Sequence, residues 1–118
     1  MKIIIAGSRT ITDYDLVKST IEKSGWLPKI TVIVSGGARG VDTLALKFAK
    51  EHNITTVKFL ADWKKHGKSA GYIRNKEMAD YADRLIALHW NFSKGTNHMI
   101  DTMLKSNKKV FLNQYLWL

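Results

Sequence analysis

Two short apolar runs are each followed at once by a glycine-rich turn, and this arrangement limits the possible folds more than any other feature. Residues 3–6 (IIIA) lead into residues 7–9 (GSR), and residues 31–34 (TVIV) lead into residues 35–40 (SGGARG). A short continuous apolar run is typical of a strand that helices cover on both faces. A glycine-rich turn from such a strand into a helix is the usual connection of α/β folds. The start of the chain therefore predicts a parallel sheet with helical crossovers.

The same alternation continues to the end of the 118 residues. Strands are predicted over residues 3–6, 31–34, 54–60, 84–88 and 109–112, and helices over about 13–24, 41–52, 70–80 and 96–106. Right-handed crossovers between five strands predict a Rossmann-like three-layer α/β sandwich with a five-stranded parallel sheet. We find no linker, internal repeat or low-complexity segment, so we expect one domain over residues 1–118.

Several local signals predict where the helices begin and end. Thr12 and Asp15 are predicted to form a capping box at the first helix, and Thr96 is predicted to cap the last one. Ser24-Gly25 is predicted to end the first helix, and Pro28 to keep the following segment out of helix. Residues 62–69 are predicted to be a polar, basic loop.

The charge balance favours an anionic ligand. The chain has 19 Lys and Arg against 10 Asp and Glu, a formal net charge of +9. Such a field attracts nucleotides, nucleic acid or acidic surfaces, although a basic balance can also serve solubility alone. The chain has no cysteine, which excludes disulfides and thiolate sites. It has no signal peptide and no apolar run long enough for a membrane, so we expect a cytoplasmic protein.

Residues 35–42 (SGGARGVD) are the strongest local motif. Glycines let a backbone approach a ligand closely, and the N-terminus of the following helix offers free N–H groups and partial positive charge, which together suit a phosphate. Asp42 can cap those N–H groups or accept a hydrogen bond from a ribose hydroxyl. In the alternative interpretation, Gly36, Gly37 and Gly40 only make a tight turn and Asp42 only caps the helix.

Two further loops are predicted to lie at the same edge of the sheet, beyond the carboxyl ends of the strands. In the loop over residues 7–9, Arg9 can pair with a phosphate in a bidentate way, and Ser8 can donate a hydrogen bond. Gly95-Thr96-Asn97 opens the last helix and supplies another set of N–H groups.

The segment from Trp63 to Asn75 mixes cations, aromatic rings and an amide: Trp63, Lys64, Lys65, His66, Lys68, Tyr72, Arg74 and Asn75. The rings can stack on a base and the cations can hold phosphate, or the segment is simply a solvated basic loop. Gly67-Lys68-Ser69 is not a P-loop, because Asp62 stands where that motif needs a glycine, and the dinucleotide fingerprint is also missing.

Together these motifs predict a phosphate-binding site. The predicted ligand-binding residues are Gly7, Ser8, Arg9, Ser35, Gly36, Gly37, Ala38, Arg39, Gly40, Asp42, Trp63, Lys68, Tyr72, Arg74, Asn75, Gly95, Thr96 and Asn97. The four histidines show no metal-ligand spacing, so we expect no metal and no cofactor.

Four stretches (residues 4–9, 35–42, 71–78 and 95–96) resemble the SLOG superfamily, in particular its small stand-alone branch related to YspA and YpsA. By this resemblance residues 35–42 correspond to the S-G-x-A-R-G-[IV]-D loop of the DNA-processing protein DprA, and Arg74-Asn75 to its Arg-Asn pair. The resemblance implies a Rossmann-like fold and a nucleotide-derived ligand.

The chain departs from the LOG phosphoribohydrolases of the same superfamily. Those enzymes carry P-G-G-x-G-T-x-x-E, whereas residues 91–99 read NFSKGTNHM, so Gly95 and Thr96 match but Met99 stands at the position of the catalytic Glu. Cleavage of a glycosidic bond normally uses a carboxylate to stabilise an oxocarbenium-like centre. If the protein is an enzyme, the candidate catalytic residues are Arg74, Asp42 and Asp101.

Three functions therefore remain open. The first is a sensor or sequestering protein for a nucleotide or nucleotide-derived signal, such as a sponge for immune signals. The second is an N-glycosidase or phosphoribohydrolase acting on a nucleoside monophosphate. The third is single-stranded nucleic acid binding like that of DprA, with a steep salt dependence. We expect the apolar residues 115–118 to form either a further strand or a contact with another subunit. We favour the subunit contact, and therefore a homo-oligomer.

Overall fold

The five strands form one parallel sheet in the order β3-β2-β1-β4-β5. This arrangement comes from a computed structural model that describes residues 1–90 and 93–115. The strands are β1 (Lys2–Gly7), β2 (Val32–Ser35), β3 (Thr55–Lys58), β4 (Arg84–Trp90) and β5 (Val110–Tyr115). In the register, Ile4 lies between Val34 of β2 and Leu85 of β4. The prediction of a Rossmann-like sandwich with five parallel strands is confirmed.

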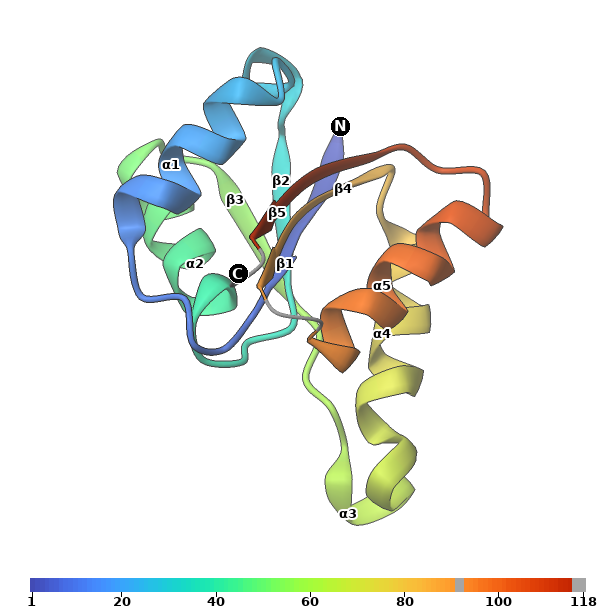
Figure 1. Ribbon diagram of the computed structural model, residues 1–118. Coiled ribbons are helices and arrows are strands. Elements are labelled where there is room, and N and C mark those ends of the chain that lie inside the picture. Colours follow the sequence, from blue (N-terminus) through green and yellow to red (C-terminus); the bar gives the residue numbers. More distant parts are fainter. Residues whose placement is uncertain (91–92, 116–118) are drawn as a thin grey trace.

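Helices cover both faces of the sheet (Figure 1). One face carries α1 (Tyr14–Lys23) and α2 (Val41–Glu51), and the other carries α4 (Ala70–Tyr81) and α5 (Lys94–Lys105). The short α3 (Trp63–His66) projects well beyond the sheet, at the start of α4. Two 3₁₀ turns, η1 (Leu27–Lys29) and η2 (Gly67–Ser69), complete the described elements.

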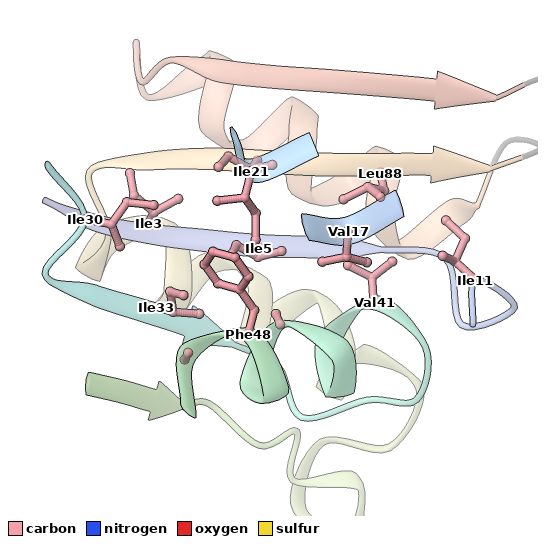
Figure 2. Packing of buried hydrophobic residues seen from close by; sticks show 13 residues of the cluster. Ile3, Ile5, Ile11, Val17, Ile21, Ile30, Ile33, Val41, Phe48 and Leu88 are labelled. Carbon is pink, nitrogen blue, oxygen red and sulfur yellow. The ribbon is translucent and has the colours of Figure 1, made fainter. Parts of the chain in front are cut away.

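The apolar run in β1 is continuous because its side chains alternate between two separate cores. Ile3 and Ile5 belong to the core under α1 and α2, where Figure 2 shows Ile3 beside Ile30 and Ile5 close to Phe48. Ile4 and Ala6, which alternate with them along β1, join the core under α4 and α5. A central strand of a three-layer fold therefore has no position left for a polar side chain.

Four local predictions are wrong. Helix α1 is capped by Asp13, whose Oδ1 accepts a hydrogen bond from the Leu16 N–H (3.2 Å), and not by a box of Thr12 and Asp15. Pro28 lies inside the 3₁₀ turn η1, where proline suits the first turn. Residues 62–69 form α3 and η2 instead of a loop. Helix α5 begins at Lys94 after the N-cap Ser93, so Thr96 lies inside it and is buried.

Strands β3, β4 and β5 differ most from their predicted lengths. β3 is limited to Thr55–Lys58 and is largely exposed, while β4 and β5 run on to Trp90 and Tyr115. Of the apolar tail, Tyr115 is the last residue of β5, and residues 116–118 lie outside the described part of the chain. None of the helices within residues 1–90 and 93–115 has the length and apolar character needed to cross a bilayer.

Candidate functional site

A cavity opens where the winding of the sheet reverses. The chain passes from β1 outward to β2 and β3, and from β4 outward to β5, so the loops after β1 and β4 diverge to opposite faces. Ligands of open α/β sheets bind in such a crevice. The cavity has a volume of about 760 Å³, which lies in the usual range for small-molecule sites. Its lining residues are Ala6, Gly7, Ser8, Arg9, Thr10, Ala38, Asp42, Arg74, Asn75, Met78, Ser93, Gly95, Thr96 and Met99.

The cavity combines apolar and polar surfaces. Met78 of α4 and Met99 of α5 are almost fully buried in the core beneath it and still line it. Around them lie residues that carry charge, namely Arg9 of the loop after β1, Asp42 of α2 and Arg74 of α4. Met99 is thus an apolar part of the cavity at the position where the LOG motif has its Glu.

Arg74 and Asn75 form hydrogen bonds with two separate segments that surround the cavity. The Arg74 Nη1 donates a hydrogen bond to the Gly36 carbonyl oxygen (2.8 Å), and its Nε donates to the Asn75 Oδ1 (3.1 Å). The Asn75 Nδ2 in turn donates to the Gly95 carbonyl oxygen (3.3 Å) and lies 3.1 Å from the His98 Nδ1. The pair therefore links the loop after β2 to the start of α5 and holds the guanidinium at the cavity.

Asp42 is a buried carboxylate in the first turn of α2. Its Oδ2 accepts a hydrogen bond from the Ala38 N–H (3.1 Å), and its side chain is 7% exposed. Burial raises the pKa of Asp42 to about 6, although the Ala38 hydrogen bond and the cations of Arg74 and Arg9 act in the opposite direction. A carboxylate with this pKa can exchange its proton near neutral pH.

The two arginines affect each other as well. Burial lowers the pKa of Arg74, the charge of Asp42 raises it, and the charge of Arg9 lowers it again. The guanidinium groups of Arg9 and Arg74 therefore repel each other across the cavity, and an anion between them would be attracted by both.

The glycines of the loop after β2 serve mainly close packing. Gly40 has a φ of 76°, and a Cβ there would lie 2.5 Å from the Ser8 carbonyl oxygen of the loop after β1. The Ser35 Oγ accepts a hydrogen bond from the Gly37 N–H (3.1 Å). Since the N–H groups of Gly37 and Ala38 bond inside the loop, they are not the free phosphate donors that the motif predicts. Of residues 35–42, only Ala38 and Asp42 line the cavity, and Arg39 is exposed.

The start of α5 offers N–H groups to the cavity. The N-cap Ser93 makes no side-chain hydrogen bond to the helix backbone, and its Oγ accepts one from the Thr96 Oγ1 (3.2 Å) instead. The first N–H groups of a helix have no partner within the helix and favour anions. Gly95 and Thr96 line the cavity as predicted, whereas Asn97 and Asp101 are exposed and line neither this cavity nor the next.

A second, smaller cavity of about 190 Å³ adjoins the first and is lined by Arg9, Trp63, Lys68, Gly71, Tyr72, Arg74, Asn75 and Gly95. The predicted base-stacking residues Trp63 and Tyr72 lie here with Lys68, while Lys64 and Lys65 do not. The Tyr72 ring also rests on His98, with 4.4 Å between the ring centroids.

Some lining residues are not among those predicted from the sequence. Thr10 and Ser93 flank the predicted loops by one or two residues, and Met78 and Met99 have only the helical spacing of core residues. His98 lies next to the predicted Asn97 and forms the contact with Asn75. In the described ranges, no group of three His, Cys, Asp or Glu is placed to hold a metal ion.

The sequence of the chain is similar to those of known proteins. Residues 1–66 match the family model of the YspA, cpYpsA-related SLOG family (YAcAr). The chain is 36% identical over 107 residues to the Gene 61 protein of Mycobacterium phage D29. This match covers 82% of this chain and 83% of the phage protein.

Among solved structures, the chain is similar in fold to DNA processing protein A (DprA) from Streptococcus pneumoniae, with a TM-score of 0.76 and 20% identity. The match covers 94% of this chain and 49% of that one, so the chain spans about half of the DprA chain. From the family model and the phage relative together, the chain belongs to the YspA, cpYpsA-related SLOG family.

Proposed function

We propose that the protein binds a nucleotide or nucleotide-derived ligand through its phosphates and acts as a sensor or sequestering protein. The observation that carries this proposal is the pair of guanidinium groups at the cavity. Among the described residues, neither Arg9 nor Arg74 forms a salt bridge, and both line the cavity next to the N-terminus of α5. Two cations that form no salt bridge within these residues, together with a helix N-terminus, form an anion site even though the Asp42 carboxylate lies near Arg74.

The rest of the cavity suits the nucleoside part of such a ligand. Met78 and Met99 offer an adaptable apolar surface to a base or sugar ring. When ionised, Asp42 can accept a hydrogen bond from a ribose hydroxyl while its other contact, with the Ala38 N–H, is kept. Membership of the SLOG family supports this choice of ligand class.

We infer that the ligand is held and not cleaved. The carboxylate that the LOG enzymes use is replaced by buried Met99, and Asp101 is exposed outside the cavity. The raised pKa of Asp42 favours one enzymatic alternative, an N-glycosidase or phosphoribohydrolase in which this carboxyl group transfers the proton.

Single-stranded nucleic acid is the second alternative. The exposed rings of Trp63 and Tyr72, the cation of Lys68 and the fold shared with DprA favour it. Binding of this kind weakens steeply as the salt concentration rises.

We further propose that residues 1–118 act as one ligand-binding domain that self-associates through residues 115–118.

The test is ligand recovery. Purified protein is mixed with a panel of nucleotides, cyclic dinucleotides and ADP-ribose derivatives, freed of unbound compound and denatured, and the released molecules are identified by mass spectrometry. We expect an intact ligand from the wild type and at least tenfold less from Arg74→Ala. The control is Lys76→Ala, which removes the same charge from the exposed face of α4, where Lys76 pairs with Asp80.

The other outcomes separate the alternatives. Recovery of a free base with a sugar phosphate would make the protein an enzyme, and Asp42→Asn should then abolish turnover. Recovery of no small molecule, together with salt-sensitive binding of an oligonucleotide, would reject the proposal in favour of nucleic acid.

A further inference from the structure

The two cavities of the site share one wall. Arg9, Arg74, Asn75 and Gly95 line both of them, so the two cavities adjoin at these four residues. We call the two adjoining cavities together the groove, the larger cavity its inner end and the smaller cavity its outer end.

The two ends of the groove offer different chemistry. The inner end has the apolar surface of Met78 and Met99 and the carboxyl group of Asp42. The outer end has two aromatic rings, Trp63 and Tyr72, of which 55% and 49% of the residue surface is exposed. Exposed rings beside cations stack on nucleobases in many nucleotide-binding proteins. Each end therefore suits a ring system.

The shared wall between the ends carries the positive charge. Arg74 is half-buried and fixed by hydrogen bonds to Gly36 and Asn75, while Arg9 is exposed across from it. Gly95, in the first turn of α5, brings helix N–H groups to the same place. Phosphates are therefore expected in the middle of the ligand and not at its end.

The aromatic rings are held where they can act. The Asp62 Oδ1 accepts a hydrogen bond from the Lys65 N–H (3.1 Å), which caps the short helix that begins at Trp63. The Tyr72 ring is supported on one side by His98. A ring that already rests on a neighbour, as Tyr72 does, loses little conformational entropy when a base stacks on it.

We infer that the ligand has two ring-bearing ends, each a nucleoside or a comparable ring, joined by phosphates that lie at the shared wall. This inference rests on the proposed function and narrows its ligand class from nucleotides in general to dinucleotide-like compounds. One ring occupies the inner end over Met78 and Met99, and the other stacks on Trp63 or Tyr72 at the outer end.

The test compares matched ligands by calorimetric titration of the full chain. The probes are the nucleoside monophosphate, the nucleoside diphosphate and the dinucleoside diphosphate of adenine, guanine and uracil. In at least one series we expect the two-ended probe to bind about tenfold or more tightly than either one-ended probe, since stacking of one base contributes roughly that factor. The variants Trp63→Ala and Tyr72→Ala should reduce this advantage without changing the affinity for the monophosphate.

Two control variants lie close to the outer end without lining it. Leu60→Ala truncates an exposed apolar side chain (72% exposed) ahead of α3, and Lys64→Ala removes a charge within α3. Both should keep the advantage of the two-ended probe, and Trp63→Phe should restore part of what Trp63→Ala loses. Because Trp63 and Tyr72 are exposed, their variants are expected to fold.

The outcomes distinguish this inference from the proposed function. If a monophosphate or diphosphate binds and its two-ended counterpart binds no more tightly in any series, the inference is wrong and the proposed function stands. If no nucleotide binds at all, the proposed function fails and the inference with it. Preference for an oligothymidylate over every two-ended probe would also overturn the inference, because the groove would then serve a polymer.

Discussion

The guanidinium of Arg74 occupies the space in which a side chain at position 36 would have to stand. Its Nη1 lies 2.6 Å from where a Cβ on Gly36 would be placed, and it donates a hydrogen bond to the carbonyl oxygen of the same residue. The Oδ2 of Asp42 lies 3.0 Å from the same point. Gly36 therefore serves the site by leaving room for Arg74, even though it does not line the cavity itself.

Gly36→Ala is expected to affect binding more than folding. The new methyl group displaces the flexible end of Arg74, which costs about 1–2 kcal/mol of unfolding free energy through the lost hydrogen bond. Ligand affinity, measured by titration, should fall at least tenfold because the guanidinium no longer faces the cavity. Gly71→Ala is a control for stability alone, because Gly71 lines the smaller cavity; its Cβ would make an ordinary 3.6 Å contact with Trp63, and the variant should keep or raise stability. Unchanged ligand affinity in Gly36→Ala would contradict this role of Arg74.

Asp42→Asn is expected to change how stability depends on pH. The folded protein binds a proton at Asp42 more tightly than the unfolded chain does, because burial raises the pKa from 3.8 to about 6. Asp42 therefore stabilises the fold most below pH about 4, and this contribution is lost as the pH rises through about 6. The amide of Asn can still accept the Ala38 hydrogen bond and carries no charge.

The corresponding measurement is urea unfolding of both proteins between pH about 4 and 8. Relative to the wild type, Asp42→Asn should gain up to about 3 kcal/mol across this range, with the change centred between pH about 4 and 6. Other carboxyl groups titrate in both proteins alike, so they cancel in the difference. A difference that stays flat with pH would show that Asp42 is not destabilised by burial. The gain in stability should come with weaker ligand binding.

Asn75→Asp is expected to raise the pKa of His98. In the wild type the Asn75 Nδ2 lies 3.1 Å from the His98 Nδ1, and an amide N–H can only donate, so this contact favours a His98 Nδ1 without a proton. Burial lowers the pKa of His98, Asp101 raises it and Lys105 lowers it. A carboxylate at position 75 favours a proton on Nδ1 instead, so the pKa of His98 should rise relative to that in the wild type.

An NMR titration of the histidine ring protons measures this shift. The matched control is Asn97→Asp, which introduces the same charge at the residue before His98, on the exposed surface of α5. It should produce a clearly smaller rise. Equal shifts in the two variants would mean that the charge alone, and not the hydrogen bond, controls His98.

Deletion of the residues after Gln114 is expected to shift the protein to a smaller assembly. This prediction follows from the apolar character of residues 115–118 and concerns mainly residues outside the described part of the chain. Light scattering after gel filtration gives the mass directly. Leu104→Ser changes another exposed apolar residue, on α5, and should leave the mass unchanged. An unaltered mass after the deletion would count against the tail as a subunit contact.

The central part of the fold was predictable because its signals are local. The apolar runs of β1 and β2 and the glycines after them lie within a few residues of one another, and their pattern needs no knowledge of the partner strands. Helix α3 was not predictable in this way. It has only four residues and no apolar periodicity, and its N-cap Asp62 also suits a loop.

The site was predictable only as a set of loops. The bond from Arg74 to Gly36 spans 38 positions and the one from Asn75 to Gly95 spans 20, and spacing in sequence does not reveal such partners. The glycine motif predicted where the turns lie, but sequence spacing did not reveal the neighbours that require the glycines. Gly7, for example, is required because a Cβ there would lie 2.5 Å from the Leu88 carbonyl oxygen of β4.

The position of β1 between β2 and β4 has a consequence for biosynthesis. β1 leaves the ribosome well before β4, which covers one of its two edges and ends only at Trp90. Until then the nascent chain exposes an apolar strand edge, the kind of surface that invites pairing with other chains. The sheet can therefore close around β1 only after β4 has been synthesised, so the two central strands cannot pair early in translation.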